Sequence, residues 1–197
     1  MSNNDWRISK RAIGVLFQCI LSSEKEKLRF IEFGSGKSTF FLCELGVRDF
    51  RDYEVVSFDD SEEFAFKGGY PFLDLKIRSL VETDDIGFER MFSEGVIIPE
   101  VLWDKRTPLW TRQRNNFYKI LDGDISGKYD FVILDGPNGN GRSLAWLYLK
   151  EHLVEGAVIL VDDVGHYDFV DRMLSVFSVS QIVYDVEDNF AIFRVTK

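Results

Sequence analysis

The sequence feature that most constrains the fold is a glycine-rich turn that directly follows an apolar, strand-like run. Residues 28–33 form this run, which contains Glu32, and the turn with Gly34 and Gly36 leads into a segment of helical spacing. Because glycine has no Cβ, such a turn lets the backbone approach a ligand closely. The start of the following helix offers unpaired N–H groups to the same ligand. The stretch therefore predicts a ligand-binding loop between a strand and a helix.

Two familiar nucleotide-binding loops fit this turn only in part. Gly36-Lys37-Ser38 matches the end of a phosphate-binding loop, but Ile31 stands where that motif requires its first glycine. Residues 131–135 resemble the strand that accompanies such a loop, so a P-loop nucleotide-binding protein or NTPase remains the main alternative. The nicotinamide fingerprint requires a third glycine where this chain has Thr39.

The pattern acid-x-Gly-x-Gly-x-small fits at every position, with Glu32, Gly34, Gly36 and Ser38. It resembles the cofactor loop of class I S-adenosylmethionine-dependent methyltransferases. The resemblance implies that Glu32 meets the charged amino-acid end of S-adenosylmethionine and that Gly34, Ser35, Gly36 and Ser38 pack against the cofactor. An acid at the end of a strand also suits a ligand with an ammonium and a sulfonium group better than a triphosphate.

Strand-like and helix-like segments alternate along the chain. We expect strands over residues 28–33, 53–59, 73–78, 129–135 and 156–162, helices over 5–21, 38–45, 61–64, 112–121, 142–152 and 167–177, and a hairpin of 181–186 with 190–195. This order predicts an α/β fold with a doubly wound, mostly parallel, seven-stranded Rossmann-like sheet and a C-terminal antiparallel hairpin. The methyltransferase fold has such a hairpin, whereas most dinucleotide-binding folds lack it.

The chain length of 197 residues predicts a single domain over 1–197. We expect residues 1–27 to form a helical extension whose helix is capped by Asp5. Gly46 should end the helix that follows the glycine turn. Residues 82–120 are less regular, and the resemblance implies that they form an insertion that covers the substrate.

Acidic residues follow several predicted strands, and the carboxyl ends of parallel strands meet at one edge of a sheet. Asp59, with Asp60 beside it, ends the second strand about twenty residues after the glycine loop, where an acid can accept the hydroxyls of a ribose. By resemblance, Leu80 and its neighbours approach the adenine. A solvated acidic turn is the alternative for the pair of aspartates.

Three further acids follow two apolar strands: Asp135, in the sequence Asp-Gly-Pro, and the pair Asp162 and Asp163. Adjacent acids at a buried strand end require a positive partner. Their oxygens would suit Mg²⁺ or another divalent cation. Without a metal, the pair would position substrate hydroxyls or cap the next helix. The chain is similar here to metal-dependent O-methyltransferases such as catechol O-methyltransferase, which makes Asp135 a catalytic candidate, although Asn138 lies where those enzymes place a lysine. His166 at the same edge is a candidate general base, and an ordinary surface histidine near a helix start is the alternative.

Residues 103–119 hold five basic residues and four aromatic residues but a single acid, in a chain with a net charge of −9. Such a segment suits a sugar acid, a phosphorylated small molecule or single-stranded nucleic acid, or forms a solvated helix face. Together with this segment, the resemblance to O-methyltransferases implies O-methylation of a small-molecule or carbohydrate acceptor. A non-catalytic binding module with the same fold is a third interpretation.

The overall acidity argues against duplex nucleic acid as a partner. The apolar run over residues 12–21 is too short to span a membrane. Cys19 and Cys43 match no metal-binding spacing, which indicates buried thiols and favours a cytoplasmic location. The sequence leaves a homodimer open.

Overall fold

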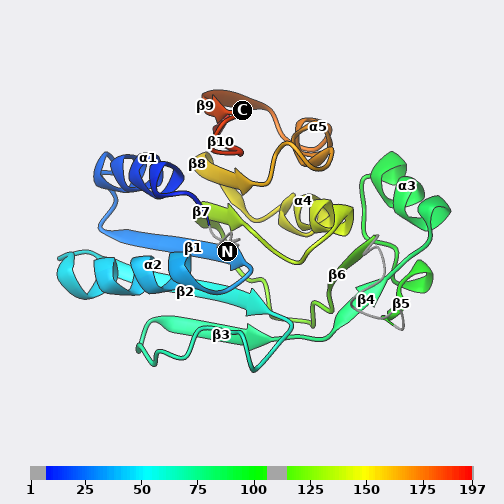
Figure 1. The fold of residues 1–197 in the computed structure, drawn as a ribbon, viewed down its shortest axis with the longest axis horizontal. Helices are drawn as coiled ribbons and strands as arrows, with labels where there is room; N and C mark the ends of the chain where they lie inside the picture. Colours follow the sequence, from blue (N-terminus) through cyan, green and yellow to red (C-terminus); the bar gives the residue numbers. More distant parts are fainter. Residues whose placement is uncertain (1–7, 106–114, 197) are drawn as a thin grey trace, which may run out of the picture.

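The fold is seen in a computed structural model that describes residues 8–105 and 115–196, and its centre is a seven-stranded sheet (Figure 1). The strand order is β3-β2-β1-β7-β8-β10-β9. The strands are β1 (Lys27–Phe33), β2 (Asp52–Asp59), β3 (Leu73–Ile77), β7 (Tyr129–Leu134), β8 (Leu153–Asp162), β9 (Val179–Asp185) and β10 (Phe190–Val195). All neighbouring pairs are parallel except β8–β10 and β10–β9. The predicted fold class is confirmed.

The central strands are apolar because both of their faces are covered. Every residue of β7 is buried, and β1 is buried along most of its length. Continuous apolar character is typical of parallel strands between two helical layers. This explains why the sequence pattern located these strands well.

Two hydrophobic cores lie on opposite faces of the sheet. One contains residues of α1 (Lys10–Leu21) and α2 (Lys37–Arg48), packed against side chains such as Phe30 and Ile133. The other contains residues of α3 (Asp85–Glu94), α4 (Ala145–Leu149) and α5 (Phe169–Leu174), packed against Phe33 and Val132. Strand residues that are neighbours in sequence thus contribute to different cores, because successive side chains of a strand point to opposite faces of the sheet.

A second, small sheet lies beyond the carboxyl ends of β1 to β3 (Figure 1). Its antiparallel strands have the order β5-β4-β6, and they are β4 (Leu80–Glu82), β5 (Trp103–Asp104) and β6 (Asn116–Tyr118). The 3-10 helix η1 (Pro99–Val101) precedes β5. The predicted helix over 112–121 is wrong where the structure describes it, because residues 116–118 pair with β4 and are buried. Residues 112–114 lie outside the described residues.

Several predicted helix boundaries are also wrong. Helix α1 begins at Lys10, and its cap is Ser9, whose Oγ accepts a hydrogen bond from the Ala12 N–H at 3.0 Å. Asp5, the predicted cap, lies outside the described residues. Helix α2 continues through Gly46 to Arg48. An added Cβ at Gly46 would lie 2.9 Å from the Phe72 ring. Gly46 therefore allows close packing and does not end the helix.

The remaining corrections concern shorter segments. Residues 61–64 form a turn and no helix. The predicted helix over 142–152 is divided into the 3-10 helix η2 (Asn140–Leu144) and α4, and β8 already begins at Leu153. Helix α5 spans only Phe169–Leu174.

Within the described ranges, none of the helices has the length and apolar character needed to cross a membrane. The division of the chain into an N-terminal extension over 1–27 and an insertion over 82–120 stays a prediction.

Candidate functional site

Glu32 lies at the carboxyl end of β1, beneath the glycine turn, and is wholly buried. Its Oε2 accepts hydrogen bonds from Thr39 Oγ1 at 2.5 Å and Ser57 Oγ at 2.7 Å. Its Oε1 has no hydrogen-bond partner among the described residues. Burial raises the pKa of Glu32 to about 7, against the nearby hydroxyl groups of Ser38, Thr39 and Ser57, which lower it. One carboxylate oxygen is thus left for a donor that the described chain does not supply.

The glycine turn itself is held by Thr39. The Gly36 N–H donates to Thr39 Oγ1 at 2.8 Å, and the same hydroxyl donates to Glu32. Thr39 is fully buried at the position where a nicotinamide fingerprint requires glycine, so that interpretation does not fit. Lys37 is exposed, and a carboxylate lies beneath the turn, so a phosphate-binding loop is not supported either.

The turn also touches the loop that follows β7. Gly34 has φ +96°, and an added Cβ there would lie 2.8 Å from the Gly136 nitrogen. A Cβ added at Gly36 would meet no atom within 4 Å, so the outer side of the turn is open. An open turn above an incompletely bonded carboxylate fits the methyl-donor cofactor that the sequence predicts here.

Asp59 ends β2 and is 8% exposed. Its Oδ2 accepts hydrogen bonds from Ser35 Oγ at 2.6 Å and from the Ser35 N–H at 3.2 Å, and its Oδ1 accepts from the Ser61 N–H at 3.0 Å. Asp59 therefore fastens the glycine turn to β2. Asp60 is exposed, and Leu80 is buried in β4. Their predicted contacts with ribose and adenine stay predictions.

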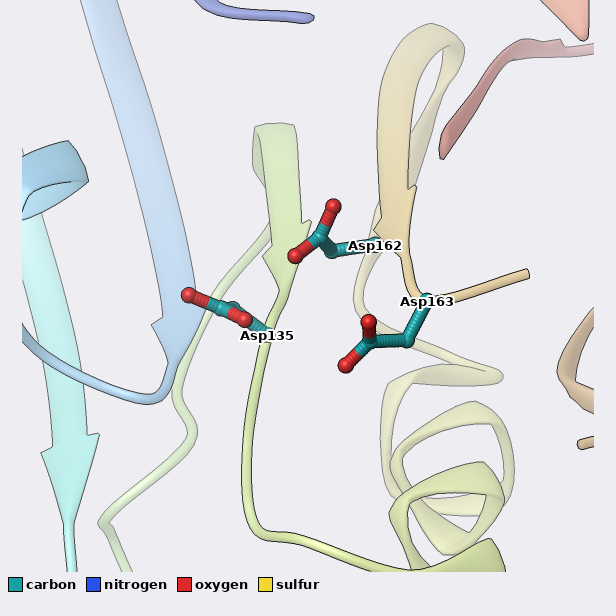
Figure 2. A group of neighbouring side chains, drawn as sticks. All are labelled: Asp135, Asp162 and Asp163. Atoms are coloured by element: carbon teal, nitrogen blue, oxygen red, sulfur yellow. The ribbon is translucent and has the colours of Figure 1, made fainter. Parts of the chain in front are cut away.

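Three carboxylates meet beside this turn, as the sequence predicted. Figure 2 shows Asp135 after β7, Asp162 at the end of β8 and Asp163 immediately after it, with the side chains of Asp162 and Asp163 directed toward the side where Asp135 lies. One oxygen from each lies within 4.8 Å of the others. Burial raises the pKa of Asp135 and of Asp162, and for Asp162 the charges of the two other acids add to this rise. The three carboxyl groups are therefore not all ionised at once unless a cation compensates their charge.

Arg142 supplies one positive charge to this cluster, and sequence reasoning missed it. Although only 2% exposed, it donates from Nε to the Pro137 carbonyl at 3.0 Å and from a terminal nitrogen to the Asp162 carbonyl at 3.4 Å. A second terminal nitrogen lies 3.5 Å from Asp163 Oδ2, and the guanidinium carbon is 5.0 Å from the centre of the Phe169 ring. The sequence contained one indication of this role. Buried acids need a positive partner, and Arg142 is the first basic residue after Asp135.

Tyr118 is a second residue whose place in the site was missed. A Cβ added at Gly136 would lie 2.6 Å from its hydroxyl, so this group borders the loop after β7. Burial raises the pKa of Tyr118 well above its usual value, and the charges of Asp59, Asp60 and Asp135 act in the same direction. In the sequence it was only one aromatic residue of the basic segment.

His166 is exposed on the turn after β8. Its Nδ1 lies 3.2 Å from Asn189 Nδ2 and 3.6 Å from Asp163 Oδ1. The structure thus brings it beside the carboxylate cluster, and its role as general base stays a prediction.

Of the basic segment over residues 103–119, the structure describes Lys105 and Lys119, while the three arginines lie outside the described residues.

The sequence profile of a family described as a methyltransferase domain matches residues 31–164, which is more than half of the chain. The chain belongs to this methyltransferase domain family. The matched region contains the glycine turn, Asp59 and all three members of the carboxylate cluster, and it ends before His166. The chain therefore contains a methyltransferase domain, and the phosphate-loop alternative is not supported.

No curated protein matches the chain significantly. Among solved structures, the methyltransferase domain is similar to a CMeT domain of the citrinin polyketide synthase, with 12% identity, a TM-score of 0.46 and coverage of 92% of this chain and 50% of that one. A probable spermidine synthase from Corynebacterium glutamicum has 12% identity, a TM-score of 0.49 and coverages of 94% and 62%.

A T. thermophilus 16S rRNA N2 methyltransferase, solved with AdoMet and guanosine, has 9% identity to the methyltransferase domain and a TM-score of 0.48. The match covers 99% of this chain and 45% of that one. The methyltransferase domain thus spans about half of the length of such solved chains.

Proposed function

We propose that this domain transfers the methyl group of S-adenosylmethionine to an oxygen of a small-molecule or carbohydrate acceptor. The donor would lie over the glycine turn, between Glu32 and Asp59, and the acceptor would stand beside Asp135, Asp162 and Asp163. The carbohydrate-like acceptor rests on the aromatic and basic composition of residues 103–119.

The observation that carries the proposal is the incomplete hydrogen bonding of Glu32. A buried carboxylate oxygen without a donor costs free energy, which a ligand ammonium group at that position would recover. Oε1 of Glu32 is such an oxygen, and the open side of Gly36 provides space for a ligand. Asp59, at the end of the next strand, would accept hydroxyl groups of the ribose while it holds Ser35.

The chain's own groups can then orient an acceptor for in-line transfer, in which the acceptor oxygen and the methyl carbon are held close together. Asp162 and Asp135 have raised pKa values, so together they can take up a proton from an acceptor hydroxyl. Arg142 would stabilise the resulting negative charge. His166 is the candidate group that passes this proton to solvent.

A divalent cation fits the same three carboxylates, because oxygen donors from Asp135, Asp162 and Asp163 come within 4.8 Å of one another. Such an ion would act as a Lewis acid toward an acceptor hydroxyl. The nearby Arg142 already compensates part of the negative charge, so it competes with an ion for these acids.

Ligand binding measured by thermal shift tests the proposal. S-adenosylhomocysteine should raise the melting temperature of the domain, whereas Mg-ATP should leave it unchanged. Glu32→Gln should remove most of the S-adenosylhomocysteine effect, because an amide cannot form the ion pair. Stabilisation by Mg-ATP alone would refute the proposal.

Methyl transfer is then measured as release of S-adenosylhomocysteine with panels of phenols, sugars and sugar acids, each with and without EDTA. We expect turnover of at least one oxygen acceptor. Binding of S-adenosylhomocysteine without turnover of any acceptor, with or without Mg²⁺, would favour a binding module.

We also propose a cytoplasmic location and a homodimer. The free thiols of Cys19 and Cys43 support the cytoplasmic location.

A further inference from the structure

We propose that Lys105 donates a hydrogen bond to a ring nitrogen of the cofactor's adenine and so helps to select an adenosine-containing methyl donor. The inference rests on the proposed function, because it uses the cofactor position derived above. No part of the sequence pattern that identified the glycine turn involves Lys105. It directly follows β5 of the small sheet, 69 residues after Gly36.

Lys105 directly follows β5, in the wall that the small sheet forms at the carboxyl ends of the main sheet (Figure 1). Its backbone N–H donates to the Leu80 carbonyl at 2.9 Å, so it is fixed beside the residue expected at the adenine. Its Nζ atom is enclosed and has no hydrogen-bond partner in the described part of the chain. An enclosed ammonium that lacks an acceptor is costly, and a bound ligand can supply that acceptor.

The charges around Lys105 decide what kind of ligand group it would meet. Burial lowers the pKa of Lys105, while the negative charges of Asp60 and Glu82 act in the opposite direction. Neither acid forms an ion pair with it in the described residues, but both lie close enough to influence its charge. An anionic ligand group would meet two carboxylates and one ammonium, which is unfavourable. A neutral acceptor avoids this repulsion.

Adenine provides such acceptors, because its ring nitrogens carry lone pairs and no charge. Asp59, which precedes Asp60 in the chain, would accept hydroxyl groups of the attached ribose. Lys105 and Asp59 would therefore recognise two neighbouring parts of one nucleoside, one as donor and one as acceptor. An acceptor-substrate carboxylate or phosphate, the alternative partner for a lysine, does not fit the local charge.

The test is calorimetric binding of S-adenosylhomocysteine and its 1-deaza, 3-deaza and 7-deaza analogues to the wild-type domain and to Lys105→Met. We expect the substitution to weaken S-adenosylhomocysteine binding about 10- to 100-fold, as for the loss of a charged hydrogen bond. One deaza analogue should bind the wild type more weakly by a similar factor. The same analogue and S-adenosylhomocysteine should bind Lys105→Met equally.

Lys119→Met is the matched control, because Lys119 lies just after β6 of the same small sheet but is exposed and paired with Asp104 at 2.8 Å. It should bind S-adenosylhomocysteine as the wild type does. Lys105→Gln keeps a neutral donor and should lose less affinity than Lys105→Met; it also serves if the methionine variant folds poorly. Unchanged affinity in both Lys105 variants would overturn the inference.

Other outcomes separate the inference from the proposed function. If Lys105→Met weakens binding but all three deaza analogues bind the wild type as well as S-adenosylhomocysteine does, the adenine contact is wrong and the proposed function stands. If the wild type binds none of these compounds, the proposed function fails, and the inference fails with it.

Discussion

Two groups of carboxylates lie at the same edge of the sheet, and their partners differ in kind. Glu32 and Asp59 receive their hydrogen bonds from hydroxyl and backbone N–H groups, chiefly those of Thr39, Ser57 and Ser35. The Asp135–Asp162–Asp163 group faces the guanidinium of Arg142 instead. The first group is held by neutral dipoles, whereas the second depends on a fixed charge.

This difference separates the two halves of the proposed reaction. Neutral donors keep Glu32 and Asp59 in place and leave their charge for the ammonium and hydroxyl groups of a cofactor. The second group holds more negative charge than one arginine compensates, so it can take up a proton or a metal ion. Four predictions test this contrast, in order of decreasing expected effect.

The largest effect should come from Arg142→Met, which leaves the three aspartates without their buried cation. We expect a loss of about 3 to 5 kcal/mol in the free energy of unfolding, the range for breaking a buried ion pair. Urea denaturation followed by circular dichroism measures it, and Arg142→Lys, which keeps the charge, should lose less. Saturating Mg²⁺ should restore more stability to the methionine variant than to the wild type.

A fully stable Arg142→Met variant in EDTA would show that the second group does not depend on a fixed charge. The contrast with the Glu32 group would then be wrong.

The next effect concerns turnover. Asp162→Asn should lower methyl transfer by about 100-fold or more, because it removes a group that takes up a proton or binds a cation. Binding of S-adenosylhomocysteine, measured by calorimetry, should change by less than about 3-fold, which is within 1 kcal/mol. Normal turnover of Asp162→Asn in EDTA would exclude both roles for this residue.

The pH dependence of stability should reveal Glu32. Its pKa in the folded protein is about 7, against an ordinary value of 4.5, so the folded state binds this proton more tightly than the unfolded state. Stability should therefore rise as the pH falls from 8 to 5.5, with roughly 2 kcal/mol from this residue, and the gain is lost again as the pH rises through 7.

The buried aspartates titrate in the same direction, so the Glu32 contribution is the difference between the wild type and Glu32→Gln in urea denaturation at the two pH values. S-adenosylhomocysteine affinity should show the opposite trend and increase with pH, since the ammonium group binds the ionised acid. Parallel pH curves for the two proteins would contradict the assigned pKa.

The smallest effect should come from Asp59→Asn. The amide keeps the shape but weakens the bonds to Ser35, and we expect about 10-fold weaker S-adenosylhomocysteine binding, as for one weakened charged hydrogen bond. Asp60→Asn is the comparison and should change the affinity less. The reverse order would assign the ribose contact to Asp60.

The sequence was sufficient to predict the main sheet, because buried parallel strands are continuous apolar runs that end in acids. It also predicted that Glu32, Asp59, Asp135 and Asp162 gather at one edge, since parallel strands end together. These inferences depend only on chain direction and strand order. Such rules need no knowledge of side-chain packing.

The small sheet could not be predicted in the same way. Its strands have two or three residues, which is too short for a period of two to be recognised. Residues 116–118 followed a basic stretch with helix-like spacing, and pairing with β4 overrode that local pattern. Arg142 and Lys105 were missed for a related reason, because their importance depends on which distant groups surround them.

The contact between Gly34 and Gly136 links the donor side of the crevice to the acceptor side through backbone alone. The Gly136 N–H donates to the Phe33 carbonyl at 2.6 Å, and a Cβ at either glycine would come within 2.8 Å of the other residue. Neither loop can be redesigned independently. Attempts to change the acceptor by engineering residues after Asp135 would therefore also disturb cofactor affinity, unless every variant keeps both glycines.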